Sequence, residues 1–396
     1  MTGEREGPAA RPRLAVLYNP KLRGIFYQLV LLAILVWLGI EFALNAKTNL
    51  QAQKIATGFG FLDNTAGFGV NQSLIAYQES DTYGRVFFVG LLNTLVVSAF
   101  GIALATAIGF LVGVARLSNN WLIARLAGVY VEVIRNLPLL FQILFWYLAV
   151  LGALPAPRNA ISVLDGVFLS NRGIAVPRPL FGEGSGLVLA AFAIGIVVTL
   201  MLRFWAQARQ EKTGQQFPLG RTAAGLILGL PLLVMIAAGF PIGFELPQLR
   251  GFNFVGGVTM IPEFTALLIA LSTYTAAFIA EIVRSGIQAV SRGQTEAAYS
   301  LGLKPGRTMS MVVIPQAMRV IIPPLTSQYL NLTKNSSLAV GIGYPDLFAV
   351  FAGTTLNQTG QAIEILAVTM AVYLVISLIT SALMNWYNSR LQLVER

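Results

Sequence analysis

The chain has 396 residues, of which 56% are hydrophobic and only 11% are charged, and its mean hydropathy is +0.70. Soluble domains carry about a quarter charged residues, so this composition excludes an ordinary soluble protein and indicates a membrane protein. The net charge of +10 does not indicate nucleic acid, because the basic residues gather in loops between apolar runs. The chain has no cysteine and no histidine, which excludes disulfides, thiolate metal sites and imidazole ligands.

Eight apolar segments approach or exceed the roughly 20 residues that a membrane-spanning helix needs. They are Ile25–Leu44, Val86–Val114, Gly128–Leu154, Gly186–Leu202, Thr222–Phe240, Glu263–Val283, Val320–Phe351 and Ala362–Met384. The chain is therefore predicted to be an all-α polytopic membrane protein with about 8 transmembrane helices. The seventh segment contains Pro323-Pro324 and a polar run from Asn331 to Ser337, so we expect it to be a broken helix.

The basic residues indicate the orientation. With the N-terminus inside, 18 lysines and arginines fall in cytoplasmic pieces and 7 in external loops, while Arg135 and Lys334 lie within apolar segments. This excess places both termini in the cytoplasm by the positive-inside rule. The expected organisation is a cytoplasmic segment (1–24), a first helix with an external segment (25–85), the main transmembrane domain (86–385) and a cytoplasmic tail (386–396).

The first apolar segment follows a basic stretch, but its apolar run is too long for a signal peptide and no clear cleavage site follows it. We therefore expect an uncleaved helix. The stretches from Asn45 to Gly84 and from Pro155 to Ser185 are expected outside the membrane, and neither shows a strand or helix pattern strong enough to name.

Two acidic–basic pairs at i, i+3 spacing occur near helix ends. Glu132 and Arg135 precede Pro138, and they form either a helix-end ion pair or part of a substrate path. Glu281 and Arg284 lie at the expected cytoplasmic end of the sixth segment, where a structural pair is the simpler reading.

A polar loop follows the sixth segment. It contains Glu296-Ala297-Ala298, then Gly302 and Pro305, and Pro315 thirteen residues after Gly302. A glycine adopts positive φ at little cost and proline suits the first turn of a helix, so we expect two short helices joined at Gly302. The surrounding basic residues place this loop in the cytoplasm.

The polar run of the seventh segment contains Lys334, Asn335 and Ser336. A lysine this far inside an apolar segment is costly unless it faces a cavity or a partner. Lys334 therefore either anchors the broken helix or contacts a substrate, and Asn335 and Ser336 are candidates for direct contact.

No energy source or catalytic cluster is present in the sequence. A phosphate-binding Walker A loop needs a Gly-Lys pair, and the chain has none. Without histidine or cysteine the usual nucleophilic arrangements are impossible. The chain is therefore not expected to be an enzyme or to carry a cofactor, and any ATP hydrolysis would occur on another polypeptide.

The order of these motifs, beginning with Gly90-Leu91-Leu92-Asn93-Thr94-Leu95, resembles that of the polar amino-acid permeases of ATP-binding-cassette (ABC) importers. It is most similar to the larger permease subunit of broad-range L-amino-acid importers of Gram-negative bacteria. The resemblance covers the second, third, sixth, seventh and eighth segments, which match the five-helix core of type I importers. The first segment and the region of about 186–240 look like additions to that core.

The resemblance implies a bacterial inner-membrane permease that works with other proteins. A cytoplasmic ABC ATPase dimer would grip the coupling loop (about 285–316). A second permease subunit would complete the path, and a periplasmic binding protein would deliver L-amino acids. Membrane lipid surrounds such a protein, and nucleic acid is not a partner.

Two positions depart from the family pattern. Asn136-Leu137 stands where Gly-Thr is usual, and Asn335 stands where an acidic residue often follows the lysine. The loss of that charge fits a site not dedicated to cationic amino acids. The alternative function is an ion-coupled secondary transporter, which would need membrane-embedded carboxylates and often two inverted repeats.

Overall fold

The computed structural model describes residues 20–52 and 57–391. Most of the expected cytoplasmic segment 1–24 and the last five residues of the expected tail lie outside these ranges. Within the described residues, seven helices are long and apolar enough to span a membrane, or eight if one bent pair is counted as a single span. The predicted polytopic helical fold is confirmed.

The bounds of the helices and strands follow the chain order. The α-helices are α1 (Pro20–Ala52), α2 (Tyr83–Ala115), α3 (Trp121–Asn136), α4 (Leu139–Leu144), α5 (Ser185–Thr213), α6 (Leu219–Ala224), α7 (Leu230–Ala237), α8 (Pro262–Gln288), α9 (Arg292–Ser300), α10 (Pro305–Thr308), α11 (Ile314–Asn335), α12 (Leu356–Thr359) and α13 (Ala362–Leu391). The strands are β1 (Ile161–Leu164), β2 (Val167–Ser170), β3 (Gly173–Val176), β4 (Arg178–Phe181), β5 (Ile242–Glu245), β6 (Gln248–Arg250), β7 (Asn253–Val255) and β8 (Val258–Met260).

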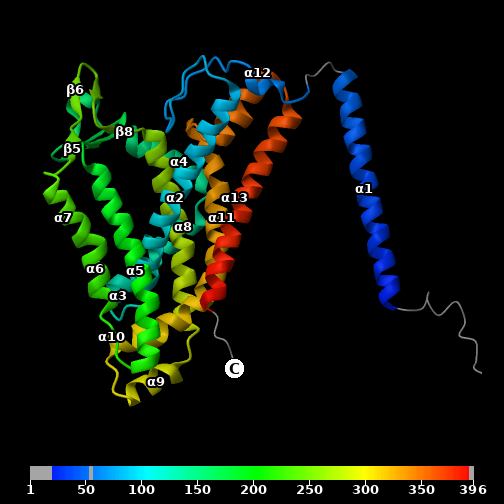
Figure 1. Cartoon of the computed structure of the whole chain (residues 1–396). Coiled ribbons are helices and arrows are strands. Elements are labelled where there is room, and N and C mark those ends of the chain that lie inside the picture. Colours follow the sequence, from blue (N-terminus) through cyan, green and yellow to red (C-terminus); the bar gives the residue numbers. More distant parts are fainter. Residues whose placement is uncertain (1–19, 53–56, 392–396) are drawn as a thin grey trace, which may run out of the picture.

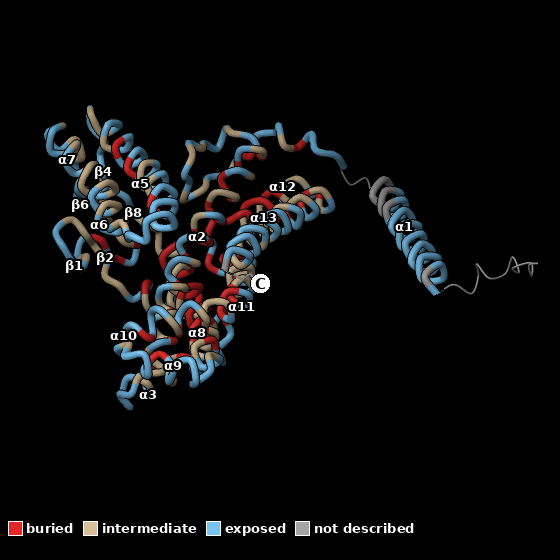
Figure 2. The backbone as a smooth tube through the Cα atoms, turned by 60° about the horizontal axis from the view of Figure 1, so that its bottom comes forward, coloured by how far each residue is buried: buried red, intermediate tan, exposed pale blue. Residues whose placement is uncertain are grey.

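Helices α2, α8 and α11 form the centre of the bundle, and the buried residues gather there (Figure 2). Four small residues on α2, each four positions after the last, are buried: Gly101, Ala105, Gly109 and Gly113. A β-carbon at Gly109 would lie 2.6 Å from Cβ of Ile279 and 3.1 Å from the carbonyl oxygen of Ala276, both on α8. Small residues let two membrane helices approach this closely, so the four small residues of α2 stabilise the bundle mainly through tight packing with α8.

The third apolar segment is not one straight helix. Helix α3 starts seven residues earlier than Gly128, and α4 continues through a π-helical turn at Phe145–Leu151. The two parts meet at an angle of 108°. The break falls at Leu137-Pro138, where Pro138 cannot donate the hydrogen bond that would continue the helix.

The seventh segment differs from its expected form. Pro323 and Pro324 lie inside the continuous helix α11, and the break comes only after Asn335. There the chain tightens into a 3₁₀ turn (Ser336–Ile342) and reverses at Gly343, whose φ is +75°. A π-helical turn (Phe348–Thr355) then leads to α12. The proline pair does not interrupt this helix, and the change to a tighter turn comes only at Ser336, near the end of the polar run.

Three added helices lie outside the core. Helices α5 and α7 pack against each other as a hairpin, and α1 stands apart from the bundle in Figure 1. Both the hairpin and α1 expose many large apolar side chains, including Leu31 and Trp37 of α1 and Leu200 and Phe204 of α5. Such surfaces fit contact with lipid or with another membrane helix.

The eight short strands were not predicted. They form a four-stranded antiparallel sheet in the order β1-β2-β3-β8 and two two-stranded antiparallel sheets, β4-β5 and β6-β7. They lie at the end of the bundle opposite α9 and α10 (Figure 1). One signal was available, because Leu164 pairs with Val167 across Asp165-Gly166, a preferred two-residue hairpin turn.

Replacing Gly109 by alanine is predicted to destabilise the bundle. The new methyl group would press on Ile279, and overpacking of this kind costs about 1–3 kcal/mol. The matched control is Gly128→Ala on α3, where no heavy atom lies within 4 Å of the new carbon. Thermal unfolding of the detergent-solubilised chain should show a lower midpoint for Gly109→Ala only. Equal midpoints for the two variants would contradict the close contact.

Candidate functional site

The loop that follows α8 contains the short helix α9, and the C-terminal end of α9 is capped. Helix α9 stops in a Schellman motif, in which Leu303 N–H donates to the Ala298 carbonyl oxygen at 3.1 Å and Gly302 N–H to that of Tyr299 at 2.9 Å. Gly302 has a φ of +76°, a conformation that residues with a β-carbon adopt only at a cost. The expected turn at Gly302 is therefore present, and we call residues 289–304 the Glu296 loop.

The Glu296 loop presents a surface to a possible partner. Glu296 and Ala297 are exposed, and Leu301 at the tip is 83% exposed. Ala298 is buried against the protein instead, and Gln316 Nε2 donates to Gln294 Oε1 at 3.3 Å. One side of α9 is thus attached to the bundle, while the other side, with an apolar tip, is free among the described residues.

The second short helix is not a separate element. Helix α10 passes through a π-helical turn (Met309–Val313) directly into α11, so a 38-residue helical run extends from Pro305 to Ile342. Pro315 lies exposed within this run, in the first turn of α11. The expected pair of short helices is better described as one short helix and the start of a long one.

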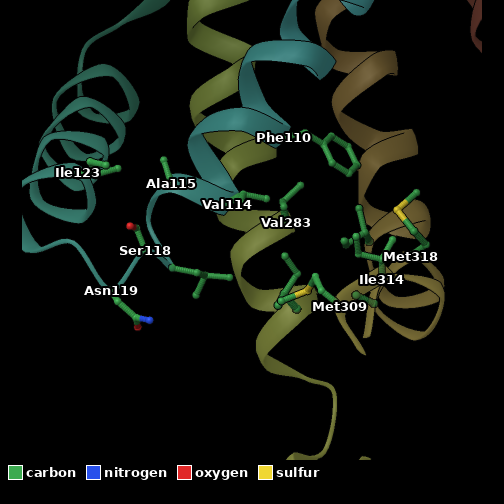
Figure 3. Close-up of a pocket in the computed structure, with 14 residues that line it drawn as sticks. Phe110, Val114, Ala115, Ser118, Asn119, Ile123, Val283, Met309, Ile314 and Met318 are labelled. Atoms are coloured by element: carbon green, nitrogen blue, oxygen red, sulfur yellow. The ribbon is translucent and has the colours of Figure 1, made fainter. Parts of the chain in front are cut away.

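An apolar cavity of about 490 Å³ adjoins the base of this helical run (Figure 3). Phe110 and Val114 of α2, Val283 of α8, and Met309 and Met318 of the helical run line it. Protein interiors rarely leave space of this size unfilled. The base of the run is therefore incompletely packed against α2 and α8.

The predicted pair of Glu281 and Arg284 is confirmed, and a third residue, Arg116, joins it. Arg284 Nε donates to Glu281 Oε1 at 3.1 Å, and Arg116 at the end of α2 binds the other carboxylate oxygen. One carboxylate therefore joins the ends of α2 and α8. The groups are only partly buried, so this ion pair mainly fixes geometry.

Glu132 and Arg135 do not form an ion pair in the described structure. Arg135 lies over the ring of Phe278, with its guanidinium carbon 5.0 Å from the ring centre. Glu132 lines a cavity of about 340 Å³ together with Arg125 and Arg284. This cavity shares no residue with the one that contains Lys334, so the structure does not bring the two predicted groups together.

Lys334 lines a cavity of about 420 Å³ between α11 and α13. Ser337, Thr369 and Tyr373 also line it, each with its hydroxyl already donating within the chain, and Phe348 and Met370 provide apolar walls. Asn335 is half-buried, and Ser336 is fully buried with its hydroxyl donating to the Thr333 carbonyl oxygen at 2.8 Å. In this conformation Ser336 does not face the cavity, because its side chain belongs to the helix wall.

A buried polar network behind this cavity was missed. Asn93 Nδ2 donates to the carbonyl oxygens of Gln72 at 2.8 Å and Pro345 at 2.9 Å, and Thr94 Oγ1 accepts from Leu347 N–H at 3.0 Å. Asp346 is fully buried, and its carboxylate accepts from Ala349 N–H at 2.8 Å. These bonds attach the reversed segment after Gly343 to α2. The polar pair Asn93-Thr94 within an apolar helix was the available signal.

The chain belongs to a known family of transport proteins. Residues 105–393 match the family described as the binding-protein-dependent transport system inner membrane component. The chain is therefore the membrane-embedded permease subunit of an ABC importer, as predicted, and the family supports this function over the ion-coupled transporter.

Three relatives match nearly the whole chain. The general L-amino acid transport system permease protein AapQ of Rhizobium johnstonii is 53% identical over 96% of this chain and 95% of its own. The putative amino-acid ABC transporter permease protein YhdX of Escherichia coli is 55% identical over 96% of each chain. The glutamate/glutamine/aspartate/asparagine transport system permease protein BztB of Rhodobacter capsulatus is 45% identical over 98% of each chain.

Removing the Asn93 amide is predicted to release both the segment around Gln72 and the segment after Gly343. Asn93→Ala leaves two carbonyl oxygens without their donor, a loss that costs about 1–3 kcal/mol when the groups are buried. Asn331→Ala, at an exposed position of α11, is the control. We expect a lower thermal midpoint and faster proteolysis between residues 57 and 82 for Asn93→Ala alone. Unchanged proteolysis would show that the amide does not hold the segment around Gln72.

Proposed function

We propose that this permease carries L-amino acids inward across the bacterial inner membrane. The names of three near-full-length relatives support the substrate class. The Lys334 cavity supports it independently, because an ammonium group attracts an α-carboxylate. The apolar walls at Phe348 and Met370 do not require a particular charge on the substrate side chain, which fits a broad range of amino acids.

The observation that carries the proposal is the continuous helical run from the Glu296 loop to Lys334. Between Pro305 and Asn335 the run is helical throughout, a length of about 45 Å at 1.5 Å per residue. We propose that movement of the loop passes along this helical run toward the cavity. The apolar cavity at the base of the run leaves room for that movement.

The energy comes from a separate cytoplasmic ABC ATPase dimer, because the chain has no Gly-Lys pair for a Walker A loop. We propose that the ATPase contacts Glu296, Ala297 and the exposed Leu301, and that its closure pushes the helical run. A second permease subunit covers the open side of the Lys334 cavity, and a periplasmic binding protein delivers the amino acid. The excess of basic residues supports a cytoplasmic position for the Glu296 loop and both termini.

Transport by the reconstituted complex tests this function directly. Liposomes that contain this chain with its partner permease and ATPase should take up labelled L-amino acids only when ATP and the binding protein are present. Liposomes with this chain alone should show no uptake. Uptake by the chain alone, driven by a proton or sodium gradient, would mean that the ATP-driven mechanism is wrong.

The role of the Glu296 loop is tested at Gly302. A branched residue at φ of +76° costs about 1–3 kcal/mol, so Gly302→Val should displace α9 and weaken ATPase attachment while the membrane helices stay folded. Gly306→Val is the matched control, because Gly306 has an ordinary φ and no neighbour within 4 Å. Co-purification of the ATPase and substrate-stimulated hydrolysis are the measurements. Normal values for Gly302→Val would remove this loop from the coupling mechanism.

The charge at position 335 is predicted to set substrate preference. Asn335→Asp adds a negative charge beside Lys334 and should favour cationic amino acids by about tenfold, which corresponds to about 1.4 kcal/mol. The control is Asn331→Asp, which adds the same charge at an exposed position one helical turn earlier. The measurement is the inhibition of labelled glutamine uptake by arginine and by glutamate, expressed as the ratio of the two inhibition constants. If both variants keep the wild-type ratio, Asn335 does not line the path.

A further inference from the structure

A further cavity lies on the strand-bearing end of the protein and shares no residue with the Lys334 cavity. It has a volume of about 540 Å³ and is enclosed by the ends of β2, β3, β7 and β8 and by the first turn of α8. Ligand cavities commonly measure about 300–1,000 Å³, so a small molecule fits in it.

One wall of this cavity carries a positioned arginine. Arg172 follows β2, and its backbone N–H donates to the hydroxyl of the buried Ser170 at 3.3 Å. The same hydroxyl donates to the Gly173 carbonyl oxygen at 3.3 Å, which fixes the turn. The guanidinium group of Arg172 donates to Asn253 Oδ1 at the start of β7. Two hydrogen bonds, one from its backbone and one from its side chain, thus hold Arg172 at the cavity, yet no described carboxylate pairs with it.

Another wall carries a carboxylate. Glu263 lies in the first turn of α8 and is half-buried. The hydroxyl of Tyr147 donates to Glu263 Oε1 at 3.0 Å, which orients the group. Among the described residues Glu263 has no cationic partner, and it does not pair with Arg172 although both line the same cavity. The amide of Asn71 and the hydroxyl of Thr259 add neutral polar groups.

We propose that this cavity binds a free α-amino acid as its zwitterion. The α-carboxylate binds Arg172, whose planar guanidinium suits a carboxylate, and the α-ammonium binds Glu263. A lone anion would be repelled by Glu263 and a lone cation by Arg172, so a ligand with both charges fits best. The external face of an importer would then hold substrate at a place separate from the translocation path. The choice of an amino acid as ligand rests in part on the proposed import function.

Binding of L-glutamine to the full chain in lipid nanodiscs tests the proposal. Two analogues separate the charges: one lacks the α-amino group and the other lacks the α-carboxylate. We expect saturable binding of L-glutamine and at least about tenfold weaker binding of each analogue, the effect of one lost charge-assisted hydrogen bond. This comparison uses the unaltered chain, so it does not depend on the folding of any variant. Absence of saturable binding, or equal binding of the analogues, overturns the proposal.

Four variants then locate the site. Arg172→Gln and Glu263→Gln should each weaken L-glutamine binding by about tenfold. Arg158→Gln and Glu183→Gln are the matched controls, because they remove the same charges from the strand-bearing end without lining the cavity. Lys334→Met should remove only binding at the Lys334 cavity and leave the binding that depends on Arg172 and Glu263. Loss of binding in Lys334→Met, with wild-type binding in Arg172→Gln and Glu263→Gln, would assign the ligand to the Lys334 cavity instead.

The binding experiment and the import experiment can fail independently of each other. If the complex fails to import amino acids but L-glutamine binding still depends on Arg172 and Glu263, the proposed function is wrong and the site stands. If import works and binding does not depend on these two residues, the site alone is wrong.

Discussion

The close contact of α2 with α8 is the constraint on which the rest of the bundle depends. Inside a membrane there is little hydrophobic drive for helices to associate, so packing between small residues becomes decisive. Gly109 and Gly113 allow the backbone of α2 to approach Ile279, Ala280 and Val283 of α8. This seam positions the end of α8, where Glu281 joins Arg116 and where the Glu296 loop begins. It also forms one side of the apolar cavity beneath α11.

Two kinds of contact hold the chain on either side of the Lys334 cavity, and they differ in strength. On the far side of the break, buried hydrogen bonds of Asn93 and Thr94 attach the segment after Gly343 to α2. At the other end of the helical run, the surroundings of Met309 and Met318 are apolar and incompletely filled. Buried hydrogen bonds are costly to break, whereas apolar surfaces can slide. The run is therefore expected to move mainly at the end that carries the Glu296 loop.

The strand-bearing end adds a different kind of surface to a protein that is otherwise apolar. Its strands place Arg172 and Asn253 beside Glu263, three residues that are far apart in the sequence. Paired short strands can hold such groups in fixed positions because their backbones are already hydrogen-bonded. The α5–α7 hairpin that interrupts these strands is a compact addition, and its exposed apolar faces leave it open to lipid or to a neighbouring subunit.

The sequence by itself determined the membrane class, the number of spans, the turn at Gly302 and the pairing of Glu281 with Arg284. These features depend on apolar length, loop charge and local spacing, all of which act within a few residues. The tertiary structure decided where the seventh helix breaks, that Ser336 is buried, that Glu132 and Lys334 line different cavities, and that Asn93 meets Pro345. It also decided the strand pairing. Such contacts join residues up to 252 positions apart, and they depend on which helix faces pack together, a property that no local pattern encodes.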